Sequence, residues 1–162
     1  MIKFGTSGFR GVIGDNFTKE NVQKIAYAMA KIFNPNDIVP IGYDNRFMGK
    51  DFAQWFVEVF CAYGKKVKFF TKPVPSPLIA FETKSVELGV MFTASHNPYI
   101  YNGMKNFQKG GRELTKEQNV QIQHLANKIK HKKMSEISLI FNFTIFSTFI
   151  LPALVIELYP YF

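Results

Sequence analysis

The stretch LGVMFTASHNP, residues 88–98, decides the fold prediction. Its first part, LGVMFTA, is a continuous apolar run of the length of one buried strand. Polar residues follow directly, so the carboxyl end of this predicted strand delivers Ser95 to a loop. Helical and strand-like segments alternate on the amino-terminal side of the run, and the sequence therefore predicts an α/β fold.

Two amphipathic helices are predicted upstream, over residues 19–33 and 50–63. Apolar residues recur at helical spacing after Thr18, a plausible N-cap, and the second helix ends at Gly64. Between the helices, DIVPIGYDNR predicts a short buried strand that delivers residues 44–46 at its carboxyl end. Pro40 removes one ladder donor, which predicts an edge position or an irregularity there.

The remaining segments continue the alternation. KVKFF predicts a strand, a proline-rich loop leads to a short helix near residues 77–84, and Thr115 with Gln118 forms a capping-box pair before a last amphipathic helix. The order β, α, β, α, β, α, β, α predicts a mostly parallel, mixed sheet with helices on both faces, an α/β/α sandwich. Ligands of such folds collect beyond the carboxyl ends of strands, where Ser95 and residues 44–46 are expected.

Composition limits the function classes. With 162 residues, 47% of them hydrophobic, the chain is long enough for one good core. The chain has a single cysteine, Cys61, in an apolar helical pattern. One cysteine excludes a disulfide framework, and this favours a cytoplasmic location. The net charge of +8 suits a nucleic-acid partner, but the basic residues are scattered. A small anionic ligand such as a phosphate ester explains the charge as well, so no nucleic-acid partner is predicted.

The Ser95 loop favours phosphoryl chemistry over a serine hydrolase. A nucleophile elbow is absent, and His96, adjacent on an extended segment, is badly placed to deprotonate Ser95. Phosphoryl transfer asks mainly for positioning and for positive groups, which Lys105 and Arg10 supply. Gly103 would let the backbone approach closely. The stretch GTSGFRG, residues 5–11, is weak evidence alone, since it can also be a turn-rich entry to the sheet.

Taken together, five segments resemble the α-D-phosphohexomutase family, which includes phosphoglucomutases and phosphomannomutases. They are KFGTSGFRG at the start, GYDNR, PVPSP, TASHNP around the serine, and NGMK after it, in the family's order. The resemblance covers roughly residues 1–133 and implies the first of the family's four domains, the phosphoserine domain. Residues 134–162 are then an atypical apolar tail.

The resemblance implies a role for each matching residue. Ser95 matches the serine that is phosphorylated and hands its phosphoryl group to a hexose phosphate, and the resulting hexose bisphosphate turns around and returns its other phosphoryl group. Lys105 matches a candidate general acid or base, with a solvated surface lysine as the alternative. Arg10 matches the arginine near the phosphoserine, with a structural salt bridge as the alternative. The same pocket is implied for Thr6, Ser7, His96 and Asn97, while Asp44 and Arg46 are expected to pair with each other.

The sequence also departs from the family. Family members hold Mg²⁺ between the phosphoserine and three aspartates of a D-G-D-x-D-R loop in the second domain, and this chain has no such loop. Ser95, through its phosphate, would be the remaining ligand, so metal-dependent turnover by this chain alone is not expected. The sugar-recognition and phosphate-binding segments of the later domains are missing as well.

Residues 137–156 contain no charge and follow a basic stretch. They are long enough to span a bilayer, but a translated frame slip or a final strand of the sheet also explains them. The sequence thus predicts a truncated phosphohexomutase, an isomerase of hexose phosphates. The alternative is a non-catalytic phosphosugar-binding or membrane-tethered protein built from the same domain.

Overall fold

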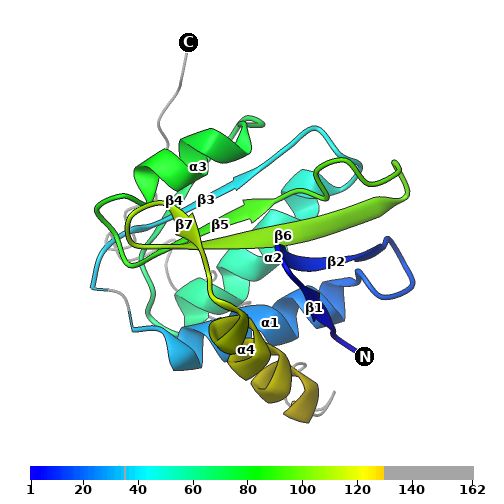
Figure 1. Cartoon of the computed structure of the whole chain (residues 1–162), viewed down its shortest axis with the longest axis horizontal. Coiled ribbons are helices and arrows are strands. Elements are labelled where there is room, and N and C mark those ends of the chain that lie inside the picture. Colours follow the sequence, from blue (N-terminus) through cyan, green and yellow to red (C-terminus); the bar gives the residue numbers. More distant parts are fainter. Residues whose placement is uncertain (35, 130–162) are drawn as a thin grey trace, which may run out of the picture.

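The computed structural model describes residues 1–34 and 36–129, whose arrangement is shown in Figure 1. These residues form one sheet of seven strands and four helices. The strands are β1 (Phe4–Gly5), β2 (Gly8–Val12), β3 (Val39–Tyr43), β4 (Val67–Phe69), β5 (Leu88–Phe92), β6 (Tyr101–Gln108) and β7 (Arg112–Glu113). The helices are α1 (Lys19–Ile32), α2 (Gly49–Ala62), α3 (Ser76–Glu82) and α4 (Lys116–Lys128).

The sheet is mixed, as the sequence predicts, but it is not mostly parallel: two strand pairs are parallel and four are antiparallel. Its strand order is β1-β2-β6-β5-β3-β4, with β7 paired to β6. Parallel pairing is confined to β3 with β4 and β5, whereas β6 runs antiparallel to β5, β2 and β7. The sequence prediction lacked β6, the longest of the described strands, because its burial does not alternate along YNGMKNFQ.

Helices cover both faces of the sheet, which confirms the α/β/α prediction. Figure 1 shows α3 on one face and α1, α2 and α4 on the other. Alternate residues of β5 divide between the two sides: Val90 and Phe92 belong to the large core beneath α1 and α2, while Met91 packs with Ile79 of α3. This period of two is what a strand buried on both faces requires.

The local signals for the helix ends are confirmed. Thr18 Oγ1 accepts a hydrogen bond from Asn21 N at 3.2 Å and begins α1. Thr115 and Gln118 form the reciprocal capping box of α4. The chain leaves α2 through Gly64, whose φ of 73° lies in the left-handed region.

Of the two alternatives for Pro40, an edge position or an irregularity, the edge position is wrong, because β3 lies between β4 and β5. Val39 N donates to Lys66 O of the β4 side, so the neighbouring Pro40 faces β5. The pairing with β5 begins only at Ile41. The missing N–H of the proline therefore falls just before that ladder.

Helix α4 closes the opposite end of the sheet, where β1 is the last strand. Asn127 accepts from Ile2 N at 3.0 Å and donates to Ile2 O at 2.8 Å. Gln123 Oε1 accepts from Phe4 N at 2.7 Å. These carboxamides replace a neighbouring strand along the edge and fix the segment that leads into the residues around Arg10.

None of the helices within residues 1–34 and 36–129 is long and apolar enough to cross a membrane. The tail interpretations for residues 134–162, including the possible span over 137–156, concern residues outside the described part of the chain.

Candidate active site

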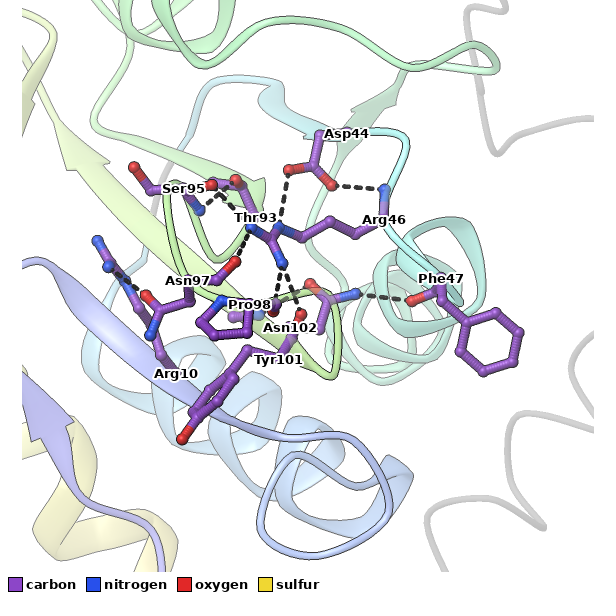
Figure 2. A network of polar contacts seen from close by, with 11 residues as sticks. Arg10, Asp44, Arg46, Phe47, Thr93, Ser95, Asn97, Pro98, Tyr101 and Asn102 are labelled. Carbon is purple, nitrogen blue, oxygen red and sulfur yellow. Dashed lines mark hydrogen bonds and ion pairs between the residues drawn. The ribbon is translucent and has the colours of Figure 1, made fainter.

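Ser95 lies on a loop that follows β5 at its carboxyl end (Figure 2). Its side chain is exposed, and its φ of 56° places a non-glycine residue in the left-handed region, which costs roughly 1–2 kcal/mol. The Ser95 amide donates to Thr93 Oγ1 at 2.9 Å. In Figure 2 the Ser95 hydroxyl points away from the neighbouring Arg46 guanidinium, whereas its carbonyl oxygen points toward that group.

A hollow of about 460 Å³ lies beside this loop. It gathers Thr6, Ser7, Arg10 and His96, four of the residues that the sequence assigned to the site. Lys3, Phe4, Gly5 and Gly8 complete the lining. The side chains around the hollow thus offer an ammonium, a guanidinium, an imidazole and two hydroxyls, and no carboxylate, which suits a phosphate group.

Arg10 is tied to the serine loop. Its Nη1 donates to Asn97 Oδ1 at 2.7 Å, a contact that Figure 2 shows between β2 and the loop. No salt bridge of Arg10 is found within the described residues, so the alternative of a structural salt bridge receives no support there. Because Arg10 also lines the hollow, this contact links the hollow to the serine loop.

Gly103 allows the close approach that the sequence predicted. A Cβ at this position would lie 2.8 Å from the carbonyl oxygens of Phe9 and Thr93 and 2.9 Å from Cγ of Arg10. Gly103 O also accepts from Thr93 N at 2.9 Å. β6 therefore brings β2, with Arg10, into register with the end of β5.

Arg46 holds the serine loop from the side of α2. Its guanidinium donates to four backbone carbonyls of the loop, which belong to Ser95, Asn97, Pro98 and Tyr101. The expected pairing with Asp44 is present, with Arg46 Nε 3.7 Å from Asp44 Oδ2 and the Arg46 amide 3.0 Å from Asp44 Oδ1. The sequence predicted the pair but not the four carbonyl contacts.

Lys105 is not among the residues that line the hollow. On β6 it lies opposite Met91, four positions before Ser95, and its Nζ is 3.2 Å from Glu113 Oε1 of β7. The side chain is 19% exposed, so it is not a freely solvated surface lysine. A role at the phosphate would require the ammonium to leave this carboxylate.

A second hollow, of about 660 Å³, is also lined by residues of the loop. Its lining includes Asn97 and the exposed aromatic side chains of Phe47 and Tyr99. The 44–46 turn forms the rest of its wall. Asn97, assigned to the phosphate pocket from the sequence, thus contacts Arg10 but does not line the first hollow itself.

The described residues do not fit Mg²⁺ by themselves. Across residues 1–34 and 36–129, no group of three or more His, Cys, Asp and Glu side chains converges to hold a metal ion. Asp44 stands at the same edge of the sheet, but its carboxylate pairs with Arg46. A phosphate on Ser95 would offer oxygen ligands without carboxylates from this part of the chain to complete the shell.

Fold and site together define an α/β domain with an exposed serine at the carboxyl end of a strand and a basic hollow beside it; Ser95 does not itself line the hollow, but the next residue, His96, does. The family model described as phosphoglucomutase/phosphomannomutase, alpha/beta/alpha domain I, matches residues 1–133. The chain belongs to this family through that first domain.

Individual relatives of the chain belong to the same family as the matching family model. The chain is 37% identical over 127 residues to phosphoglucosamine mutase 2 of Shewanella amazonensis, a match that covers 75% of this chain and 28% of that protein. It is 34% identical over 138 residues to phosphoglucosamine mutase of Afipia carboxidovorans, covering 82% and 31%. The crystal structure of a putative phosphomannomutase from Thermus thermophilus matches with a TM-score of 0.72 and 34% identity, covering 77% and 30%. The chain therefore spans less than a third of the length of these relatives.

Proposed function

We propose that this chain carries the phosphoserine part of a phosphohexomutase, an isomerase of hexose phosphates. Ser95 accepts a phosphoryl group from a hexose bisphosphate and donates it to a hexose monophosphate. The relatives are named for glucosamine, glucose and mannose phosphates, and the proposal covers this substrate class without choosing among its members.

One observation carries the proposal: the exposed Ser95 hydroxyl stands on a loop beside a hollow lined by Arg10, His96 and Lys3. Positive groups next to a nucleophilic hydroxyl favour attack on a phosphate, because they balance its charge in the transition state. The hydroxyls of Thr6 and Ser7 supply further donors to phosphate oxygens.

In the proposed transfer, Ser95 Oγ attacks the phosphorus of the bisphosphate and forms a P–O bond. The bond between phosphorus and the sugar oxygen breaks, the serine proton passes to a base, and the sugar oxygen takes up a proton. Lys105 is the proposed acid or base for the sugar hydroxyl, after its ammonium exchanges Glu113 for substrate. Asn97 is proposed to orient Arg10, and His96 to contact the phosphate.

This chain is proposed to supply the phosphoryl-carrying part of the reaction. Complete isomerisation is proposed for an enzyme that also has the remaining domains of the relatives, including carboxylates for Mg²⁺ beside the Ser95 phosphate. Such an enzyme would act on hexose phosphates in the cytoplasm.

The test is phosphoryl uptake by the 162-residue chain. The chain is incubated with glucose bisphosphate that carries radiolabelled phosphate, with and without Mg²⁺, and the labelled residue is identified by mass spectrometry of peptides. We expect one phosphate on Ser95, and we expect Ser95→Ala to abolish the uptake because no other side chain replaces the nucleophile. Ser85→Ala, a change of another exposed serine, is the matched control and should label normally. Label that persists in Ser95→Ala would contradict the assignment.

A further inference from the structure

The Arg46 guanidinium uses four of its five donors in hydrogen bonds to protein atoms. A guanidinium has five N–H groups. Nη1 donates to the carbonyls of Pro98 and Tyr101, both at 3.0 Å. Nη2 donates to the carbonyls of Ser95 at 2.7 Å and Asn97 at 2.6 Å. The remaining Nε faces Asp44 Oδ2 at 3.7 Å. All four Nη donors are therefore engaged by the loop, and Nε is held next to the Asp44 carboxylate, so Arg46 is committed to protein atoms.

The backbone that carries the Arg46 side chain is itself anchored to rigid elements. Its backbone carbonyl accepts from Gly49 N at 2.9 Å, at the first residue of α2. The next carbonyl, of Phe47, accepts from Asn102 Nδ2 at 3.1 Å, and Asn102 is fully buried in β6. The guanidinium therefore reaches the loop from a turn that is anchored to both a helix and the sheet.

The serine loop has little else to fix its shape. Ser95, His96, Pro98, Tyr99 and Ile100 are all exposed, so apolar burial contributes little to its order. The left-handed backbone of Ser95 is a conformation that persists only where the surroundings impose it. Four carbonyls held by one planar group, spaced over seven residues of the loop, impose such a conformation.

We propose that Arg46 is the positioning residue for phosphoryl transfer at Ser95. It fixes the Ser95 carbonyl on one side, so that the hydroxyl points the other way (Figure 2). Through Asn97, whose carbonyl it also binds and whose side chain contacts Arg10, it sets the distance between the nucleophile and the Arg10 charge. This inference rests on the proposed role of Ser95 and adds the group that aligns it.

A lysine cannot replace Arg46 in this arrangement. An ammonium has three donors that do not lie in one plane, so it cannot bind four carbonyls and a carboxylate at once. Arg46→Lys therefore preserves the charge and removes the geometry, whereas Arg46→Ala removes both. If alignment rather than charge matters, the two variants should behave alike.

The experiment measures the rate of phosphoryl uptake from glucose bisphosphate by the full chain, as a function of bisphosphate concentration. For Arg46→Ala and Arg46→Lys we expect the maximal rate to fall on the order of 10²-fold, as for a nucleophile displaced by about 1 Å. The half-saturating concentration and the final extent of labelling should stay as in the wild type, because Arg46 does not touch the substrate. Arg112→Ala, the loss of an exposed arginine on β7, is the matched control and should not change the rate.

A second readout does not depend on labelling. Hydrogen exchange at the loop amides of Ser95, Asn97 and Tyr101, which are bonded within the loop, should accelerate in both Arg46 variants. Exchange in the centre of β5 should remain at the wild-type rate. This pattern separates a local loss of loop order from unfolding of the whole domain.

The outcomes are distinct. Wild-type rates in both variants overturn the positioning role while leaving the phosphoserine proposal intact, and so does full activity in Arg46→Lys alone. Unchanged hydrogen exchange at the loop amides overturns the proposal that Arg46 orders the loop, whatever the labelling shows. A wild-type chain that takes up no label overturns the proposed function of Ser95. The positioning role of Arg46 in phosphoryl transfer is then overturned as well. A reduced extent of labelling together with general loss of exchange protection would show that Arg46 only supports folding.

Discussion

Replacing Asn127 by alanine tests how the edge of the sheet is held. Asn127 exchanges two hydrogen bonds with the backbone of Ile2, at 3.0 and 2.8 Å. Each such bond contributes about 1 kcal/mol net, so the pair contributes about 2 kcal/mol. Alanine has a higher helix propensity than asparagine, so the substitution in α4 stabilises the helix by about 0.5 kcal/mol and offsets part of this loss. Asn127 is exposed, but Ile2 is only 1% exposed, so its backbone N–H and carbonyl are left in a poorly solvated place and the sum of about 1.5 kcal/mol is a lower bound.

The expected result for Asn127→Ala is a decrease of at least about 1.5 kcal/mol in the free energy of unfolding, which corresponds to a decrease of at least about 3–6 °C in Tm for a chain of this size. Urea denaturation followed by circular dichroism measures the change, with equal slopes for the two proteins as the condition for comparing them. Hydrogen exchange at the Ile2 amide should accelerate at the same time.

His124→Ala is the matched control, because it places alanine at another exposed position of α4. It should change the free energy of unfolding by no more than about 0.5 kcal/mol. If Asn127→Ala proves as stable as His124→Ala, the carboxamide contacts do not hold β1, and apolar packing of Ile2 alone must do so.

Two further predictions concern Lys105 and Cys61. Lys105→Ala should slow phosphoryl uptake at least on the order of 10²-fold if the ammonium is an acid or base. The same change breaks the ion pair with Glu113, whose side chain is 37% exposed, and should lower the free energy of unfolding by no more than about 1 kcal/mol. Lys109→Ala at the following turn should change neither the rate of uptake nor the free energy of unfolding. A large loss of stability with normal uptake would make Lys105 purely structural. Burial raises the pKa of Cys61 to about 11, so its alkylation by iodoacetamide, which requires the thiolate, should rise about tenfold per pH unit up to that value. Because the unfolded thiol loses its proton first, the free energy of unfolding should fall as the pH rises from about 9 to about 11. Alkylation at the rate of a free thiol near pH 8 would refute the burial argument.

The helices of this fold were predictable because their signals are local. The residues that begin α1 and α4, Thr18 and Thr115, cap helices through atoms three positions away. The predicted ranges agree with the helices to within about two residues, which is the usual uncertainty of helix ends. The serine at the carboxyl end of β5 was predictable for the same reason, since one apolar run fixes where the strand stops.

What the sequence did not predict depends on contacts between distant residues. β6 contains Asn102, Gly103 and Asn106 at buried positions, so it lacks an alternating pattern, and its pairing with both β5 and β2 makes it a strand. The contacts of Arg46 are with backbone carbonyls 49 to 55 positions away. Every residue has a backbone carbonyl, so the amino-acid types do not show which carbonyls Arg46 binds. Lys105 is close to Ser95 along the chain, but the antiparallel turn of β6 carries it back beside Met91.

The left-handed backbone of Ser95 also limits which amino acid can supply the hydroxyl. Threonine carries the same functional group, but its branched Cβ makes a positive φ a genuine outlier. Glycine adopts the conformation freely and has no hydroxyl at all. Of the two aliphatic alcohols among the amino acids, the loop therefore accepts only the unbranched one, and the backbone selects the nucleophile before any substrate does.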